Sequence, residues 1–311
     1  MIAADSPHAA ETYTRLYRTR PTSLGLPMLL VTLALLPVLL ALACIRLLTF
    51  LLINGAYLVL PRNRWRRFLK MEWLNRLILF LCTGIIFRAP GFVGASGSCR
   101  RLVVMNHHGV QDVFLFHFLG RLGVTRLVVS YGPQFYARMR RWVFFFDHEF
   151  DLVPVSQGRK TISAGADGVT MVFPEGAGKK GPFVLNFQPS IFWLHEEVEP
   201  FAVSFKWAIP LVDAYGVDLP WHRSVCFLLL ILTPWTVVTV RQLPPFRFDR
   251  RQPFKASEQC RDLIAKAAGY QAIDFLFDQR RFDASMGASL PRGTVFFSRS
   301  LPGPCNEPKE S

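Results

Sequence analysis

Two patterns are missing from this sequence, and each absence excludes a class of site. The six cysteines are scattered along the chain, with no Cys-x-x-Cys pair among them. Without such pairs neither a disulfide framework nor a zinc cluster is indicated, so we expect reduced thiols, no metal and no bound cofactor. The pattern Gly-x4-Gly-Lys-Ser/Thr is also absent, which excludes a Walker-type nucleotide loop.

Acidic residues are scarce as well. The chain has 22 Asp and Glu against 36 Lys and Arg, which gives a formal net charge of +14. Such a charge fits nucleic acid, an anionic membrane leaflet or a phosphorylated substrate. Hydrophobic residues make up 51% of the 311 positions and include 28 Phe, so contact with lipid is favoured. The cations flank apolar segments and form no aromatic-interleaved groove, so we expect no nucleic-acid partner.

The polarity pattern divides the chain into five parts. They are a polar N-terminal tail (1–26), a membrane-embedded hairpin or anchor (27–60), an interfacial helix and linker (61–98), an α/β domain (99–285) and a flexible tail (286–311). A straight helix over residues 28–60 would be about 50 Å long, against about 30 Å for the hydrocarbon core. Arginines flank both ends of this segment, so we expect both flanks in the cytosol and a re-entrant hairpin between them. The alternative is one membrane helix over 28–45 followed by an interfacial helix.

The segment 62–87 has the composition of a helix that lies in a membrane interface. Trp and Phe recur there at helical spacing, with Arg and Lys between them. In an interfacial helix, Trp side chains sit at headgroup depth and cations face phosphates. A helix packed on the globular domain would show a similar pattern.

Short apolar runs without polar alternation follow the linker, as expected for strands buried on both faces of a sheet. These runs are 102–105, 126–129, 170–173, 201–205 and 237–240. Helical or loop segments separate them. The sequence therefore predicts an α/β fold, with a mostly parallel sheet flanked by helices. Pro234 interrupts a further apolar stretch at 225–240, which we interpret as a helix leading into a strand.

Two short motifs contain the side chains that are suited to catalysis. The first, Asn106-His107-His108-Gly109-Val110-Gln111-Asp112, follows the predicted strand 102–105. Asp112 can accept a hydrogen bond from Nδ1–H of an upstream histidine, which leaves Nε2 of that ring free to take a proton. His107 and His108 compete for this role, and capping of a helix by both rings is the non-catalytic alternative. A base of this kind without a serine implies that the nucleophile is a hydroxyl of the substrate.

The second motif, Val172-Phe173-Pro174-Glu175-Gly176, ends another predicted strand and opens a glycine-rich loop at 175–181. Glycines let backbone N–H groups approach an anion closely, and Lys179 and Lys180 add positive charge. The loop is therefore suited to a phosphate. A solvated hairpin turn is the alternative.

The order Asn-His-x4-Asp, then Phe-Pro-Glu-Gly, resembles the glycerolipid acyltransferase superfamily. The similarity covers about residues 102–269 and includes Asn186-Phe187-Gln188-Pro189. The apolar segments before and within the domain look most like those of lysophosphatidylcholine acyltransferases and of ancient ubiquitous protein. The fold that this resemblance implies is an acyltransferase-like α/β domain with an N-terminal membrane hairpin.

The resemblance also implies a reaction. His107 would be the base and Asp112 its orienting partner, and an acceptor hydroxyl would attack the thioester of acyl-CoA, which is a co-substrate. Glu175, Gly176, Lys179 and Lys180 would form the acceptor site for a lysophospholipid or a related glycerolipid alcohol. Relatives commonly have Thr and Arg directly after the Glu-Gly pair, whereas Ala and Gly stand there in this chain.

The resemblance further implies a place and an alternative role. The place is the cytosolic face of the endoplasmic reticulum, with lipid droplets as a second surface. The alternative role is that of a membrane-anchored adaptor that keeps the fold without catalysis, as in ancient ubiquitous protein. The intact His107 and Asp112 favour the enzyme.

Overall fold

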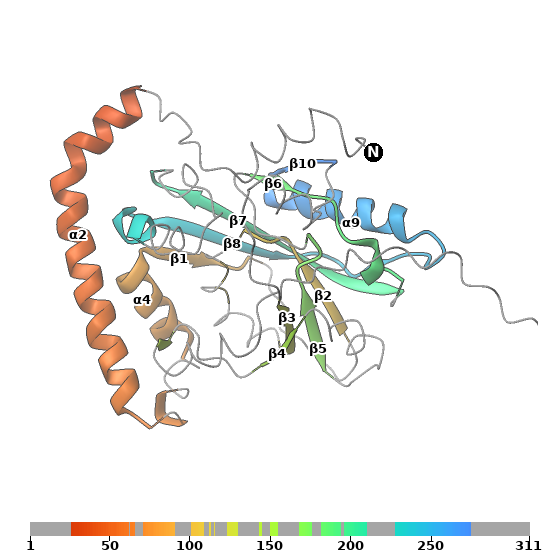
Figure 1. Ribbon diagram of the computed structural model, residues 1–311, viewed down its shortest axis with the longest axis horizontal. Coiled ribbons are helices and arrows are strands. Elements are labelled where there is room, and N and C mark those ends of the chain that lie inside the picture. Colours follow the sequence, from red (N-terminus) through yellow and green to blue (C-terminus); the bar gives the residue numbers. More distant parts are fainter. Residues whose placement is uncertain are drawn as a thin grey trace, which may run out of the picture.

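An eight-stranded sheet forms the centre of the fold, with helices on both of its faces (Figure 1). Its strands lie in the order β1-β8-β7-β2-β5-β3-β4, and β9 pairs with β7. The computed structural model describes residues 26–61, 63–65, 71–90, 101–108, 112, 115, 123–129, 143–144, 150–154, 168–175, 182–193, 196–209 and 228–274.

The strands of this sheet confirm the predicted α/β fold. They are β1 Ile85–Arg88, β2 Arg101–Met105, β3 Val124–Val129, β4 Asp151–Pro154, β5 Val169–Val172, β7 Glu197–Trp207, β8 Thr236–Gln242 and β9 Phe246–Arg247. β7 runs antiparallel to β8 and β9, and the other paired strands of the described sheet are parallel. A small second sheet pairs β6 Phe183–Val184 with β10 Gln271–Ala272.

The helices are α2 Leu26–Val59, α4 Glu72–Thr83 and α9 Pro253–Ala268, with a short 3-10 turn η4 at Pro189–Ile191. β2 lies between two cores that these helices cover. Its residues Val103 and Met105 face the core shared with α2 and α4, whereas Leu102 and Val104 face the core under α9. Both faces of the strand are thus apolar, which explains why the run does not alternate.

α2 is one continuous helix, so the predicted re-entrant hairpin is wrong. The buried side chains of α2 are Leu39, Arg46 and Tyr57, and Phe50 and Ile53 are partly buried against the core of the domain. In chain order these five residues are seven, four, three and four positions apart. Such spacing places them in one stripe along an uninterrupted helix. This packing outweighs the helix-breaking tendency of Pro37 and Gly55. By length and composition alone, α2 could cross a membrane.

The predicted helix over 62–87 is shorter in the structure. α4 ends at Thr83, where Gly84 caps it in the left-handed conformation (φ +72°) and its N–H donates to the carbonyl of Phe80. Such a glycine ends helices readily because it has no Cβ. β1 begins at the next residue and pairs with β8, so part of the predicted interfacial segment belongs to the sheet. The prediction of a helix leading into a strand at 225–240 is confirmed by helical residues 228–232 followed by β8.

Arg46 attaches α2 to the end of this second helical segment. Its Nη1 donates to the carbonyls of Ile231 (2.8 Å) and Thr233 (2.5 Å), and its Nη2 donates to the carbonyl of Pro234. The last carbonyls of a helix have no partner within the helix and carry partial negative charge, so a guanidinium satisfies them well. An arginine within an apolar helix is therefore accommodated on the side that faces the domain.

Gly84 tests this attachment. A Cβ added at Gly84 would lie 2.3 Å from Nη2 of Arg46, whereas one added at Gly269, which has nearly the same φ (+71°), would meet nothing within 4 Å. We expect Gly269→Ala to cost about 1–2 kcal/mol from backbone strain alone. Gly84→Ala should cost at least about 1 kcal/mol more, because Arg46 must give up hydrogen bonds to make room. Chemical unfolding of the purified variants in detergent measures both losses of stability. Equal losses would show that the hydrogen bonds of Arg46 do not stabilise the fold.

Candidate active site

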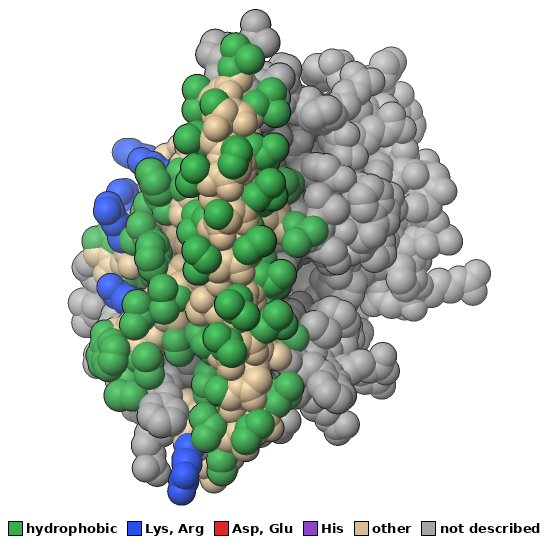
Figure 2. Space-filling view, turned by 90° about the vertical axis from the view of Figure 1, so that its left-hand side faces the viewer, with side chains coloured by type: hydrophobic (Ala, Val, Ile, Leu, Met, Phe, Trp, Pro, Cys, Tyr) green, Lys and Arg blue, Asp and Glu red, His purple; other side chains and the backbone are tan. Residues whose placement is uncertain are grey.

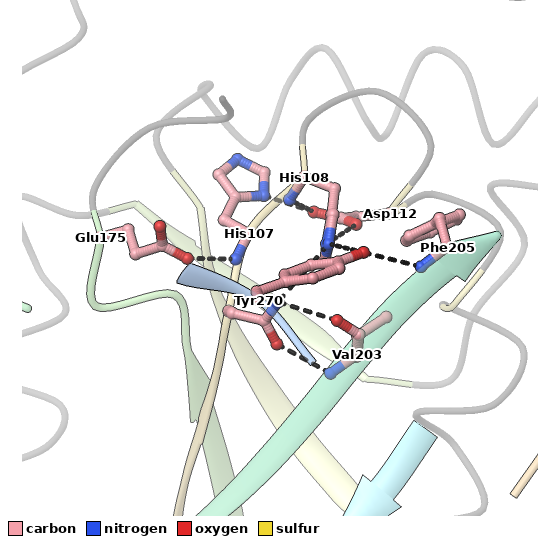
Figure 3. A network of polar contacts seen from close by, with 8 residues as sticks. His107, His108, Asp112, Glu175, Val203, Phe205 and Tyr270 are labelled. Carbon is pink, nitrogen blue, oxygen red and sulfur yellow. Dashed lines mark hydrogen bonds and ion pairs between the residues drawn. The ribbon is translucent and has the colours of Figure 1, made fainter. Parts of the chain in front are cut away.

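The two sequence motifs meet because the strands before them are parallel neighbours. β2 and β5 pair with Val104 opposite Val172, and His107 and Glu175 each lie three residues beyond that pair. Both residues therefore emerge at the carboxyl edge of the sheet, where sites of parallel α/β folds are commonly found. The N–H of His107 donates to Oε1 of Glu175 at 2.8 Å (Figure 3).

Asn106 fixes the end of β2 against β7. Its Oδ1 accepts the N–H of Val203 at 2.8 Å, and its Nδ2 donates to the carbonyl of Val203 at 2.9 Å. The side chain is fully buried and continues the β2–β7 ladder beyond the last backbone pair, Met105 with Phe201. The backbone that leads into His107 is therefore held in a fixed position.

His107 and Asp112 form the predicted pair. Nδ1 of His107 hydrogen-bonds to Oδ2 of Asp112, and the same oxygen accepts the N–H of His108 at 2.8 Å. The His107 ring packs on Phe173, which follows β5, with 4.6 Å between ring centroids. These contacts hold the ring on both sides, and Figure 3 shows it pointing away from the sheet.

The Asp112 carboxylate is buried but charged. Burial alone would raise the pKa of Asp112. The hydrogen bond from the His107 ring, the electrostatic attraction of the His107 and His108 rings and the backbone N–H of His108 together outweigh burial and hold the pKa of Asp112 below its ordinary value. An ionised carboxylate only accepts hydrogen bonds, so Nδ1 of His107 must carry the proton and Nε2 must be the basic nitrogen.

The His107 side chain is partly exposed to solvent. Its exposed fraction is 23%, and within the described part of the chain Nε2 makes no hydrogen bond. No described Ser, Thr or Cys side chain bonds to this ring either, so the described site holds a base and no nucleophile of its own. Such a base can remove a proton from a hydroxyl that a substrate supplies.

Glu175 lies in the site but turns both oxygens toward the protein backbone. Oε1 accepts the N–H of His107 and Oε2 accepts the N–H of Leu185, each at 2.8 Å. The side chain is fully buried. Glu175 thus ties the chain after β5 to the ends of β2 and β6, a role that the sequence did not reveal.

Sequence reasoning also missed Tyr270, which follows α9. Its hydroxyl lies 3.2 Å from Nε2 of His108 and accepts the N–H of Phe205 at 2.8 Å (Figure 3). The His108 ring is buried between Phe205 and Tyr270, with centroid distances of 4.7 and 5.4 Å. His108 therefore points into the protein, whereas the His107 ring is partly exposed, so the geometry favours His107 as the candidate base.

The rest of the predicted acceptor site lies outside the described residues. Gly176, Lys179 and Lys180 are all outside the described residues, so the binding of a phosphate by this loop stays a prediction. Among the residues that the structure does describe, no group of three or more His, Cys, Asp or Glu side chains could hold a metal ion.

Comparisons with known proteins give a structural likeness. No family model matches the chain, and no curated protein matches it. Among solved structures, the 1-acyl-sn-glycerophosphate (LPA) acyltransferase PlsC from Thermotoga maritima is similar, with a TM-score of 0.41 and 14% sequence identity. The match covers 73% of this chain and 97% of that chain.

Replacing Glu175 by Gln tests its structural role. The amide NH₂ would face one of the two backbone N–H groups, so one buried donor would lose its acceptor. We expect Glu175→Gln to lower the free energy of unfolding by about 1–3 kcal/mol. The matched control is Glu196→Gln, whose side chain is 73% exposed and which should change stability by less than about 0.5 kcal/mol. A fully stable Glu175→Gln variant would show that the two backbone hydrogen bonds are dispensable.

Proposed function

We propose that this chain is an acyl-CoA-dependent O-acyltransferase that acylates a lysophospholipid or a related glycerolipid alcohol at a membrane surface. The observation that supports it most is the His107–Asp112 pair, in which the His107 side chain is partly exposed and no Ser, Thr or Cys among the described residues bonds to its ring. The motif order that resembles glycerolipid acyltransferases supports acyl-CoA as the donor and a glycerolipid alcohol as the acceptor.

In the proposed reaction, the acceptor O–H bond breaks and its proton passes to Nε2 of His107. The acceptor oxygen bonds to the thioester carbonyl carbon, the carbon–sulfur bond breaks, and coenzyme A leaves as a thiol with the proton from His107. Asp112 stabilises the imidazolium that forms between these two proton transfers. No acyl-enzyme is required.

The acceptor would meet the loop after β5. Lys179 and Lys180 would attract the phosphate of the acceptor, and the backbone at Gly176 would allow close approach. Glu175 would contribute indirectly, because both of its oxygens are already bonded to backbone N–H groups. A lysine is a point charge without the bidentate geometry of arginine, so we expect loose selection among phosphate-bearing headgroups.

The proposed membrane contact is the apolar face, which we define as the exposed apolar side chains of α2 and α4. Its members include Leu33, Val38, Ile45, Leu48 and Leu52 on α2 and Trp73, Leu77 and Phe80 on α4. The two helices pack against each other. In Figure 2 hydrophobic side chains cover the length of α2, with Lys and Arg side chains at the margin. Apolar side chains bordered by cations suit a bilayer with anionic lipids.

The orientation of α2 follows from its attachment. The stripe from Leu39 to Tyr57 lies against the domain, and Arg46 is bonded to residues 231–234. If α2 crossed the bilayer upright, the polar parts of the domain beside it would enter the hydrocarbon core, at a cost of several kcal/mol for each unsatisfied group. We propose that α2 lies along the membrane on the cytosolic face of the endoplasmic reticulum, with lipid droplets as a second surface.

The base can be tested by substitution. We expect His107→Ala to lower kcat by about 10²- to 10⁴-fold, the usual contribution of general acid–base catalysis. Asp112→Asn should be nearly as damaging, because the amide can present an N–H to the ring and favour the wrong tautomer. His108→Ala should lower kcat much less, since that ring is buried between Phe205 and Tyr270. The measurement is acyl transfer from acyl-CoA to a panel of lysolipids and diacylglycerol, with variants matched for yield and melting temperature.

Two results would decide against this assignment. Wild-type turnover by His107→Ala, or a dead His108→Ala beside an active His107→Ala, would remove His107 from the role of base. A wild-type protein that acylates no member of the panel would favour the adaptor.

The membrane contact predicts a fractionation and a topology. The protein should remain in the membrane pellet through high-salt and carbonate washes, because the apolar face buries far more apolar area than an electrostatic attachment provides. Tags at both termini should be cleaved by protease added to the cytosolic side. Protection of the N-terminal tag alone would show that α2 crosses the bilayer, and release by carbonate would argue against burial of the apolar face in lipid.

A further inference from the structure

His108 occupies a position between the proposed base and the C-terminal part of the domain. Its Nδ1 lies 3.8 Å from Oδ1 of Asp112, and its Nε2 lies 3.2 Å from the Tyr270 hydroxyl and 3.5 Å from Nδ2 of Asn106. One ring nitrogen of His108 therefore faces the carboxylate and the other faces two polar groups (Figure 3).

The direction of these contacts follows from the neighbours. The Asn106 amide is oriented by Val203, which both donates to Oδ1 and accepts from Nδ2, so an N–H of Asn106 is what faces Nε2 of His108. The Tyr270 oxygen accepts the N–H of Phe205 and keeps a second lone pair, so its hydroxyl can either donate to His108 or accept from it. The Asn106 N–H can only donate, so this contact makes Nε2 of His108 an acceptor, to which the Tyr270 hydroxyl then donates.

A histidine whose Nε2 accepts is neutral and carries its proton on Nδ1. In this tautomer the Nδ1–H dipole of His108 points toward Oδ1 of Asp112. The distance of 3.8 Å is too long for a hydrogen bond, but the dipole still favours the charged carboxylate. The opposite tautomer would direct a lone pair at the same carboxylate and disfavour its charge.

We infer that Tyr270 is a positioning residue for the His107–Asp112 pair and acts through the tautomer of His108. Oδ2 of Asp112 then accepts the hydrogen bond from His107, and Oδ1 faces the N–H dipole of His108. Both interactions stabilise the ionised carboxylate and hold its orientation. Tyr270 is itself held in place, because its N–H donates to the carbonyl of Ala265 at the end of α9. The C-terminal end of α9 thereby supports a site formed by the motif at β2.

The kinetic consequence of this inference rests on the proposed function, whereas the tautomer can be observed without any substrate. The full chain labelled with ¹⁵N-histidine in detergent micelles, and its Tyr270→Phe variant, are compared by long-range ¹H–¹⁵N correlation. The spectrum of His108→Ala identifies the His108 signals among the seven histidines. Tyr57→Phe is the matched control, because it removes a buried tyrosine hydroxyl on α2.

We expect His108 of the wild-type protein to be protonated at Nδ1, and Tyr270→Phe to move the proton wholly or partly to Nε2. Tyr57→Phe should leave the His108 signals unchanged. In the acyl-transfer assay Tyr270→Phe should lower kcat about 3- to 10-fold, the kinetic equivalent of one neutral hydrogen bond, with KM unchanged. His108→Ala and the double variant should lose no more than a similar factor, because both changes interrupt one path.

A wild-type His108 protonated at Nε2 would overturn the inference, as would an unchanged tautomer in Tyr270→Phe. Losses that multiply in the double variant would also overturn it. Should Tyr270→Phe fail to fold, the wild-type spectrum still decides the tautomer. Absence of acyl transfer in the wild-type protein would refute the proposed function and leave the tautomer result standing.

Discussion

A carboxylate removed from water is costly unless its oxygens receive hydrogen bonds, and Asp112 is such a carboxylate at the end of the central strand. Its Oδ2 accepts both the His107 ring and the His108 N–H, so one oxygen fixes two consecutive residues. The hydrogen bonds that stabilise this buried charge thus hold His107 and His108 in place after β2. The geometry of the proposed base depends on this stabilisation of a desolvated carboxylate.

Glu175 imposes a similar constraint on the neighbouring strand. It is buried like Asp112, and its two oxygens bridge the backbone of His107 and Leu185. Because β2 and β5 are in register at Val104 and Val172, the two carboxylates approach the same turn from adjacent strands. A slip of one residue would move Glu175 to the opposite face of the sheet and leave His107 N–H without its acceptor. The register of the parallel sheet and the position of the base therefore depend on each other.

Local patterns predicted β2, β3, β5, β7 and β8 and the His107–Asp112 pair, because strand burial and a five-residue spacing are both encoded within short stretches. The hairpin was predicted wrongly, because helix length, membrane thickness and flanking arginines do not reveal that α2 packs on the domain through Arg46, Phe50, Ile53 and Tyr57. No local sequence pattern indicated a role for Tyr270. Its partner His108 is 162 residues away, and only the fold brings the end of α9 to β2. The inward orientation of Glu175 likewise depends on a backbone donor from a distant strand.

The apolar face and the site belong to one packed unit. Tyr57 of α2 lies in the same core as Val103 and Met105, and Met105 directly precedes the Asn106 side chain that anchors the motif. Close-packed cores deform little, so α2 holds a fixed position relative to His107. If the apolar face rests in lipid as proposed, the base is then presented at a constant height above the bilayer. The proposed acyl transfer to a membrane-bound acceptor would benefit from such a fixed position.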